Sequence, residues 1–444
     1  MIMNAKPSKK IGTESYKGVR DFYPQDMFVQ NYIFGVMRKA VESFGYSEYG
    51  ASILEPADLY RAKTGEEIVN EQTYTFKDRG EREVTLRPEM TPTVARMVAA
   101  KKREFSFPLR WYSIPNLFRY EQPQKGRLRE HWQLNADIFG VESIEAEIEM
   151  ISIAHRIMTT FGLKDSDYEI RVNDRKIMNY VLGELLSLSP SESHSVSKII
   201  DKKDKMGKID FAEKIRSVVS AKSDDLLNLL HSKNLEEFIN LLPEKARSHQ
   251  GLMEIKDLME RLAEIEIKNV VFSPTLMRGF DYYTGIVFEI FDTNPENRRA
   301  VFGGGRYDDL LDIFGAEKIP AVGFGMGDVT TRDVLETYNL LPKHTPVAEL
   351  YLCVLEEKYQ NYANKLAQRL RKEGLNVAVD YSNKKAGDQI KYADKNLIPF
   401  VICVGENEVK NEEFKVKNLK SGEETVLKTE EVAGFLKNID NKQK

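Results

Sequence analysis

The sequence predicts an α+β protein in three parts: a mixed strand-and-helix domain, a helical segment inserted into it, and a C-terminal α/β domain. Three observations predict this organisation. The chain has 444 residues, which is too long for one ordinary hydrophobic core. Strand and helix patterns alternate up to residue 172 and resume at residue 269, whereas the intervening residues have the pattern of charged helices. After residue 347 the order is βαβαβ, which predicts a parallel or mixed sheet with helices on its faces.

The composition indicates a soluble, cytoplasmic protein. Hydrophobic residues make up 41% of the chain and charged residues 30%, and no apolar run approaches the roughly 18 residues that a membrane span needs. The net charge of −4 argues against a protein that coats nucleic acid by bulk electrostatics, so any RNA contact would be local. Residues 1–15 lack the apolar core of a signal peptide and are predicted to be a disordered tail.

The first strong patterns are a helix over residues 27–44 and a hairpin over residues 73–86. After the hairpin, Thr91 followed by Pro92 predicts an N-cap with proline at the first helical position. Glu89 therefore lies near a helix start. The helix dipole alone would favour a carboxylate there, so this position by itself does not require a ligand.

The central stretch has a strand, loop, strand pattern. Residues 109–113, 116–120 and 131–139 have strand character, and residues 121–130 carry turn and charge signals. Three arginines, at positions 119, 127 and 129, stand close to Glu121 in this stretch. The guanidinium group of arginine binds phosphates through paired hydrogen bonds, so the loop is a candidate phosphate-binding site. Solvated hairpin charges are the alternative.

The strand after this loop alternates in polarity. Alternation places Gln133, Asn135 and Asp137 on one face, and it places the apolar residues between them on the other face. A polar row in an otherwise apolar sheet is typical of a site for a small polar substrate.

The rest of the chain supports the division into parts. A periodic helix is predicted at 144–161, helices continue over 175–267, and a strand returns at 269–273. Residues 341–346 have the composition of a linker. Cys353 and Cys403, which are the two cysteines of the chain, lie in predicted strands of one domain and indicate buried thiols rather than a disulfide framework or a zinc site.

Several motifs resemble those of the histidyl family of class II aminoacyl-tRNA synthetases. The central stretch is similar to motif 2 of that class, with Phe118-Arg119-x-Glu121 followed by PQKGR at residues 123–127. The other similar segments follow in the family's order: GVRD at 18–21, LRPEMT at 86–91, RGFDYYTG at 278–285, GGRYD at 304–308, and the motif 3 position at 321–335.

The resemblance implies a catalytic domain on an antiparallel sheet from residues 16–172 and 269–340, a helical insertion at 173–268, a linker at 341–346 and an anticodon-binding α/β domain at 347–444. It implies a histidine–tRNA ligase that activates L-histidine with ATP and Mg²⁺ and then transfers histidine to the 3′ end of tRNA(His). It also implies a homodimer, because motif 1, here the helix at 27–44, is the dimerisation element of the class. An ordinary core helix is the alternative.

The resemblance also implies site residues. Those implied for histidine are Glu89, Thr91, Gln133, Asp137, Tyr282 and Tyr283. Those implied for ATP are Arg119, Glu121, Arg127, Gly304 and Arg306, with Arg332 as a further candidate. The attacking carboxylate of the amino acid is already ionised at neutral pH, so the reaction needs positive charge rather than a base. Arg119 and Arg278 are therefore the catalytic candidates, and the sequence leaves the metal ligands open.

Two positions depart from the pattern of the family. Asp137 stands where many members have glutamate, and Thr330 stands where an arginine clamps the γ-phosphate of ATP. Arg332, two residues later, is one substitute for that arginine; another cation, or weaker ATP binding, are the other interpretations. The altered motif 3 keeps a second function open, namely a non-catalytic histidine-binding paralogue that regulates ATP phosphoribosyltransferase. The intact RGFDYYTG segment and the C-terminal domain favour the ligase.

Overall fold

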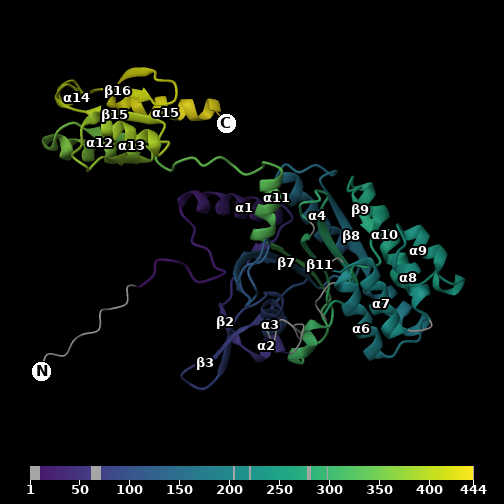
Figure 1. The fold of residues 1–444 in the computed structure, drawn as a ribbon. Coiled ribbons are helices and arrows are strands. Elements are labelled where there is room, and N and C mark those ends of the chain that lie inside the picture. The colour runs from purple at the N-terminus through teal and green to yellow at the C-terminus, as the bar shows by residue number, and fades with distance from the viewer. Residues whose placement is uncertain are drawn as a thin grey trace, which may run out of the picture. The chain divides into compact units, whose positions relative to one another are not determined.

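The computed structural model describes residues 11–61, 72–203, 206–219, 222–277, 282–297 and 299–443, with side chains through residue 439. The chain divides into two compact units, Met1–Pro342 and Lys343–Lys444 (Figure 1). Within the described ranges, no helix has both the length and the apolar character needed to cross a membrane. Most of the tail predicted to be disordered, residues 1–10, lies outside the described residues.

Unit 1 is built on a large sheet whose nine described strands run in the order β1-β5-β7-β12-β11-β10-β8-β9, with β6 paired to β7. The pairs from β5 to β8 are antiparallel, and the edge pairs β1–β5 and β8–β9 are parallel. The strands are β1 (Ser47–Glu48), β5 (Leu109–Ser113), β6 (Asn116–Phe118), β7 (Glu130–Phe139), β8 (Tyr168–Asp174), β9 (Val270–Phe272), β10 (Ile286–Asp292), β11 (Ala300–Arg306) and β12 (Ala321–Gly327). The predicted α+β class with an antiparallel sheet is confirmed.

Helices and a small second sheet complete the part of unit 1 around this sheet. The small sheet has the order β2-β4-β3, with β2 (Leu54–Pro56) beside the predicted hairpin of β3 (Tyr74–Lys77) and β4 (Glu83–Leu86). The helices are α1 (Pro24–Glu42), α2 (Asp58–Arg61), α3 (Thr91–Lys101), η2 (Lys102–Glu104), α4 (Glu145–Thr160), η7 (Leu310–Phe314) and α11 (Asp328–Thr337).

The start of α3 differs from the prediction by one residue. Met90 is the N-cap, and no side chain caps the helix. Met90 has a helical ψ of −23°, so the turn begins before Thr91, and Pro92 lies within the first turn as predicted. The Thr91 hydroxyl is therefore not used as a cap.

The segment between β8 and β9 is helical throughout its described part. Its elements are α5 (Arg175–Asn179), a π-helical turn η3 (Tyr180–Leu185), α6 (Pro190–Asp201), α7 (Lys208–Val219), α8 (Ser223–Leu230), α9 (Leu235–Leu241), η6 (Glu244–Ala246) and α10 (Gln250–Glu264). Figure 1 shows these helices gathered beside β8 and β9, at one end of the large sheet. The helix α10 packs directly on both strands.

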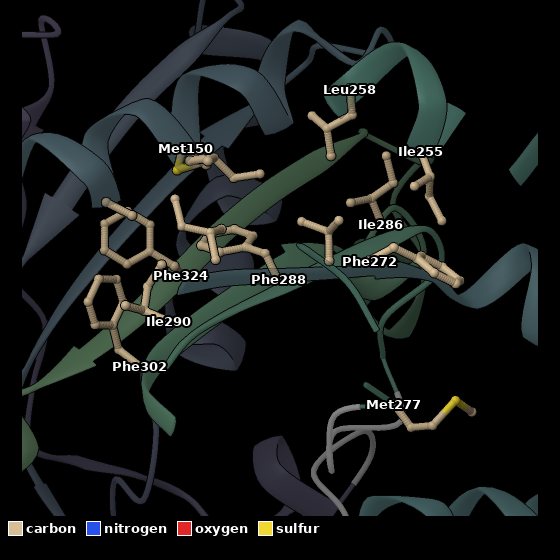
Figure 2. Close-up of a cluster of buried hydrophobic side chains, with 14 of the residues drawn as sticks. Met150, Ile255, Leu258, Phe272, Met277, Ile286, Phe288, Ile290, Phe302 and Phe324 are labelled. Atoms are coloured by element: carbon tan, nitrogen blue, oxygen red, sulfur yellow. The ribbon is translucent and has the colours of Figure 1, made fainter. Parts of the chain in front are cut away.

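One face of the large sheet is buried under α4 and α10. Met150 from α4 and Leu258 from α10 belong to the same buried cluster as Phe288 of β10 and Phe324 of β12 (Figure 2). Full burial of such side chains contributes about 1.5–3 kcal/mol each. These two helices therefore cover this face of the sheet.

Asp328, the first residue of α11, ties the N-terminal segment to the sheet. Its carboxylate is 1% exposed and accepts hydrogen bonds from Arg20 Nη2 at 2.7 Å, Gln30 Nε2 at 2.9 Å and the Trp132 backbone N–H at 2.9 Å. These donors come from the N-terminal segment, from α1 and from β7. One buried carboxylate therefore holds three parts of the chain together.

Unit 2 has a five-stranded sheet in the order β14-β13-β15-β16-β17. The predicted elements are confirmed as β13 (Leu350–Val354), α12 (Gln360–Lys372), β14 (Val377–Val379), α13 (Ala386–Lys395) and β15 (Phe400–Val404). Further elements follow: α14 (Glu406–Asn411), β16 (Glu413–Asn418), β17 (Glu424–Lys428) and α15 (Thr429–Gln443), besides the short η8 (Glu357–Tyr359). Cys353 and Cys403 are free thiols on neighbouring strands; Cys353 is buried and Cys403 only partly so.

Candidate active site

A cavity of about 370 Å³ lies against the face of the large sheet opposite α4. Gln133, Asn135 and Asp137 of β7 line it, whereas Leu134, Ala136 and Ile138 lie in the core cluster on the other face. The alternation predicted for this strand is confirmed. The polar row of β7 therefore forms one wall of a cavity.

Asp137 is the carboxylate of this wall and is buried. Its Oδ1 accepts a hydrogen bond from the Tyr307 hydroxyl at 2.5 Å, and its Oδ2 is buried without a partner among the described groups. Burial raises the pKa of Asp137 to about 7, although the Tyr307 hydroxyl acts to lower it. A buried acceptor without a donor costs free energy, so Oδ2 is suited to a donor on a ligand.

Glycines of β12 make room for this wall. A Cβ added at Gly323 would lie 2.1 Å from Asp137 Oδ1, and one added at Gly325 would lie 2.1 Å from Gln133 Nε2. Any side chain on these two residues would therefore occupy the space of the β7 side chains. Gln133 Nε2 in turn donates to Asn135 Oδ1 at 2.7 Å, which fixes the amide within the wall.

A second carboxylate lines the same cavity from the start of α3. Glu89 is 2% exposed and accepts a hydrogen bond from the Tyr282 hydroxyl at 3.2 Å. The ring of Tyr283 lies 4.9 Å from that of Tyr282, centroid to centroid, and both tyrosines line the cavity together with Thr91. The cavity thus has an acidic corner with a nearby hydroxyl, which suits an ammonium group.

Arginines reach the cavity from the residue after β6 and from the loop that follows it. Arg119 Nε donates to the Pro88 carbonyl at 2.8 Å, and Arg127 forms an ion pair with Glu121 at 3.3 Å. All three charged side chains line the cavity. Arg129, which the sequence grouped with them, is instead buried, lies 4.1 Å over the Tyr120 ring and donates to the Glu121 carbonyl. Arg129 is therefore a structural residue of the loop.

His131 also lines the cavity and was not singled out from the sequence. Burial, followed by the charges of Arg119 and Arg20, lowers the pKa of His131 to about 3, so the imidazole is neutral at physiological pH. The signal was available, because His131 continues the alternating row of Gln133 and Asp137. Tyr307 was likewise missed, although it lies within the GGRYD segment at 304–308.

The glycine-rich segment, for which the resemblance implies ATP contacts, is a strand. Gly303, Gly304 and Gly305 lie inside β11, which pairs with β10 on one side and β12 on the other. A Cβ at Gly304 would lie 2.0 Å from the Gly323 carbonyl oxygen, so close strand packing requires glycine there. Gly303 lines the cavity, and Gly304 is not part of the lining that the described residues form.

Two predicted ATP ligands are engaged elsewhere. Arg306 forms a buried, two-pronged ion pair with Glu147 at 2.6 and 2.7 Å, and it also donates to two backbone carbonyls. Arg332 pairs with Asp26 and Glu336 near the surface. The motif 3 position itself, Thr330, does line the cavity. The other catalytic candidate, Arg278, lies outside the described residues.

The sheet, the cavity on its open face and the second unit identify the class of protein. Residues 348–439 match the family model "Anticodon binding domain". Together with the antiparallel sheet of unit 1, this match defines a class II aminoacyl-tRNA synthetase with an anticodon-binding domain. Within that class, residues 18–328 match the family model "Histidyl-tRNA synthetase".

Individual relatives agree with this match. The chain is 43% identical over 93% of its length to a Histidine–tRNA ligase of Leptospira biflexa, covering 94% of that protein. It is 36% identical over 95% of its length to a Histidine–tRNA ligase of Thermoplasma volcanium, covering 98% of that protein. The crystal structure of a histidyl-tRNA synthetase from Nostoc superposes with a TM-score of 0.80 at 22% identity, covers 97% of this chain and all of that one, and supports the fold. The chain belongs to the histidyl-tRNA synthetase family.

Proposed function

We propose that the chain is a histidine–tRNA ligase, which forms histidyl-adenylate from L-histidine and ATP and then charges tRNA(His). The observation that carries this proposal is that one cavity joins the buried carboxylates Asp137 and Glu89 to the cations Arg119 and Arg127. An acidic wall suits the imidazole and ammonium of histidine, and the cations suit the phosphates of ATP.

Histidine is bound in the acidic half of the cavity. The carboxylate of Glu89 and the hydroxyl of Thr91 hold the α-ammonium. Asp137 Oδ2 accepts a hydrogen bond from the imidazole, and Tyr283 lies beside it. Gln133, with Tyr282 at the Glu89 corner, completes this half. A pocket whose polar groups hydrogen-bond both imidazole nitrogens discriminates against amino acids without an imidazole. The difference in kcat/KM is roughly four orders of magnitude.

ATP is bound in the basic half. Arg119 carries positive charge to the point where the histidine carboxylate attacks the α-phosphorus, and the same role is proposed for Arg278. Glu121 and Arg127 bind the nucleotide. Arg306 and Arg332 are not proposed as ATP ligands, because their guanidinium groups are held by other residues. No base is needed in this step, because the attacking carboxylate is ionised at neutral pH.

Magnesium is proposed to enter as part of the nucleotide substrate. The described residues contain no group of three or more metal-binding side chains. Mg²⁺ usually keeps several waters and takes one or two carboxylates besides substrate phosphates, and the carboxylates of Glu121 and Glu289 are among the residues that line the cavity. These residues fit a metal carried by ATP, where it would offset phosphate charge.

Two partners are proposed from the family: tRNA(His) and a second copy of the chain. Unit 2 would bind the anticodon of the tRNA. The reaction is assigned to the cytoplasm. The outward residues Tyr23 and Met27 near the start of α1 leave apolar surface exposed, which supports a dimer contact there. Sedimentation at several protein concentrations tests the dimer directly.

The decisive test is ATP–pyrophosphate exchange with each of the twenty amino acids, in wild-type and Arg278→Ala protein. Exchange with histidine alone, lost in the variant, is the expected result. Histidine binding without exchange would instead favour the regulatory paralogue. A chain that ends at Pro342, the boundary of unit 1, adds a second comparison, since it should exchange pyrophosphate but fail to charge tRNA(His).

A further inference from the structure

A second cavity, of about 410 Å³, adjoins the active-site cavity. The two share Gly126, Ala300, Val301 and Thr330 as lining residues, so they meet along one common wall. That wall is formed by the loop between β6 and β7, the first residues of β11 and the first turn of α11. A ligand that extends past Thr330 from the first cavity therefore enters the second.

Thr330 brings no charge to this wall. Its hydroxyl donates to the Val301 carbonyl at 2.7 Å, and its methyl group lies 3.7 Å from the place a Cβ would take on Gly126. The loop thus packs closely on Thr330. A phosphate passing this wall must find its cation on a neighbouring element.

Arg299, the residue before β11, is the guanidinium that lines the second cavity. Its Nη2 donates to the side-chain carbonyl of Gln124 at 3.0 Å, which is a neutral partner. By contrast, Arg127 and Arg332 are paired with carboxylates. Among the described residues no ion pair involves Arg299, so a phosphate can replace Gln124 without breaking a salt bridge.

Two acids line the second cavity besides Arg299. Asp333 faces Lys125, whose charge offsets its own, and burial raises the pKa of the Asp333 carboxyl. Glu296 is exposed at the rim, where solvent screens it. Arg299 and Lys125 are exposed as well, so the lining holds two cations, Arg299 and Lys125, beside two acids.

We propose that Arg299, assisted by Lys125, binds the terminal phosphates of ATP and the pyrophosphate that leaves, in place of the arginine absent at Thr330. This inference rests on the proposed function. Arg299 lies just before β11, the strand that packs against α11. From there it serves the same region that a side chain at position 330 would serve from α11. A charge-assisted contact to phosphate is stronger than the present contact to an amide.

The test is ATP–pyrophosphate exchange by Arg299→Ala and by the double variant Arg299→Ala/Thr330→Arg, with ATP varied at saturating histidine and histidine varied at saturating ATP. Loss of one charge-assisted contact should raise the KM for ATP about tenfold or more, while the KM for histidine stays unchanged. Thr330→Arg should restore the KM for ATP in the double variant. Arg216→Ala, at an exposed ion pair of α7, is the matched control.

An unchanged KM for ATP in Arg299→Ala overturns the inference, and so does a raised KM that Thr330→Arg fails to restore. The proposed function is tested separately, by pyrophosphate exchange with the wild-type protein. If the wild type shows no exchange, calorimetric titration with MgATP decides the inference: equal affinity of wild type and Arg299→Ala overturns it, and weaker binding by the variant supports it.

Discussion

The hydroxyl of Tyr307 lies 2.5 Å from Asp137 Oδ1 and joins the residue after β11 to the C-terminal part of β7. The two residues are 170 positions apart in the sequence. Tyr307 engages one carboxylate oxygen of this cavity-lining residue, and the other oxygen is buried without a partner among the described groups. The pair therefore orients the group to which histidine recognition is assigned.

Replacing Asp137 should impair histidine binding selectively. Asp137→Ala removes the proposed imidazole acceptor, and loss of a hydrogen bond to a charged group should raise the KM for histidine about ten- to hundredfold. The KM for ATP should change little. Pyrophosphate exchange measures both, with Asp309→Ala, at an exposed ion pair, as the control. An equal rise in both KM values would argue against the assignment.

The same carboxyl should make stability depend on pH. Its folded-state pKa is about 7, whereas an unfolded aspartate has a pKa of about 4. Between these values the folded protein holds a proton that the unfolded chain has released, so the free energy of unfolding falls as pH rises. Asp137→Asn cannot titrate and so does not lose this stability as pH rises. The difference in melting temperature, variant minus wild type, should therefore increase between about pH 5 and about pH 8.

Thermal unfolding of the protein without histidine checks this prediction, because a bound imidazole would change the titration of Asp137. Asp309→Asn serves as the exposed control. A difference in melting temperature between Asp137→Asn and wild type that stays constant over the whole pH range would contradict it.

The ion pair of Arg306 with Glu147 should matter for stability. Both side chains are buried, so Arg306→Met leaves an unpaired buried charge and should lower the free energy of unfolding by about 3–5 kcal/mol. Arg332→Ala breaks more exposed pairs and should cost under about 1 kcal/mol. Urea unfolding of the two variants compares them. Similar losses would mean that Arg306 is not the structural residue described.

Gly323 should be required for the shape of the histidine half. The methyl group of Gly323→Ala would meet Asp137 Oδ1 at 2.1 Å and the Ala136 carbonyl at 2.8 Å, so it must displace the carboxylate or the strand. Histidine binding should be lost, which calorimetry measures. Gly387→Ala, where the added Cβ meets nothing within 4 Å, is the control. Unchanged histidine affinity in Gly323→Ala would contradict this geometry.

Local sequence patterns predicted the structural features that depend on residues close together in the chain. The period of a strand is enough to place Gln133, Asn135 and Asp137 on one wall, and extending it by two residues would have found His131. The predicted N-cap at Thr91 was wrong by one residue. The helix starts one residue earlier because the backbone of Met90 is already helical, which the type of its side chain does not indicate.

Long-range pairing could not be predicted in this way. The partner of Arg306 lies 159 residues away in α4, and no local pattern marks Glu147 as its counterion. The motif suggested a ligand contact, whereas tertiary packing gives the guanidinium a buried partner. The same holds for Arg299, which lines one cavity with Thr330 because β11 packs against α11.

Asp328 connects α1 to the active-site strand. Because one carboxylate binds Gln30 of α1 and the backbone of Trp132, a shift of α1 pulls on the residue between His131 and Gln133. Whatever holds α1 in place also sets the geometry of the cavity wall. A displacement of α1 would therefore be transmitted through Asp328 to the backbone of the cavity wall at Trp132.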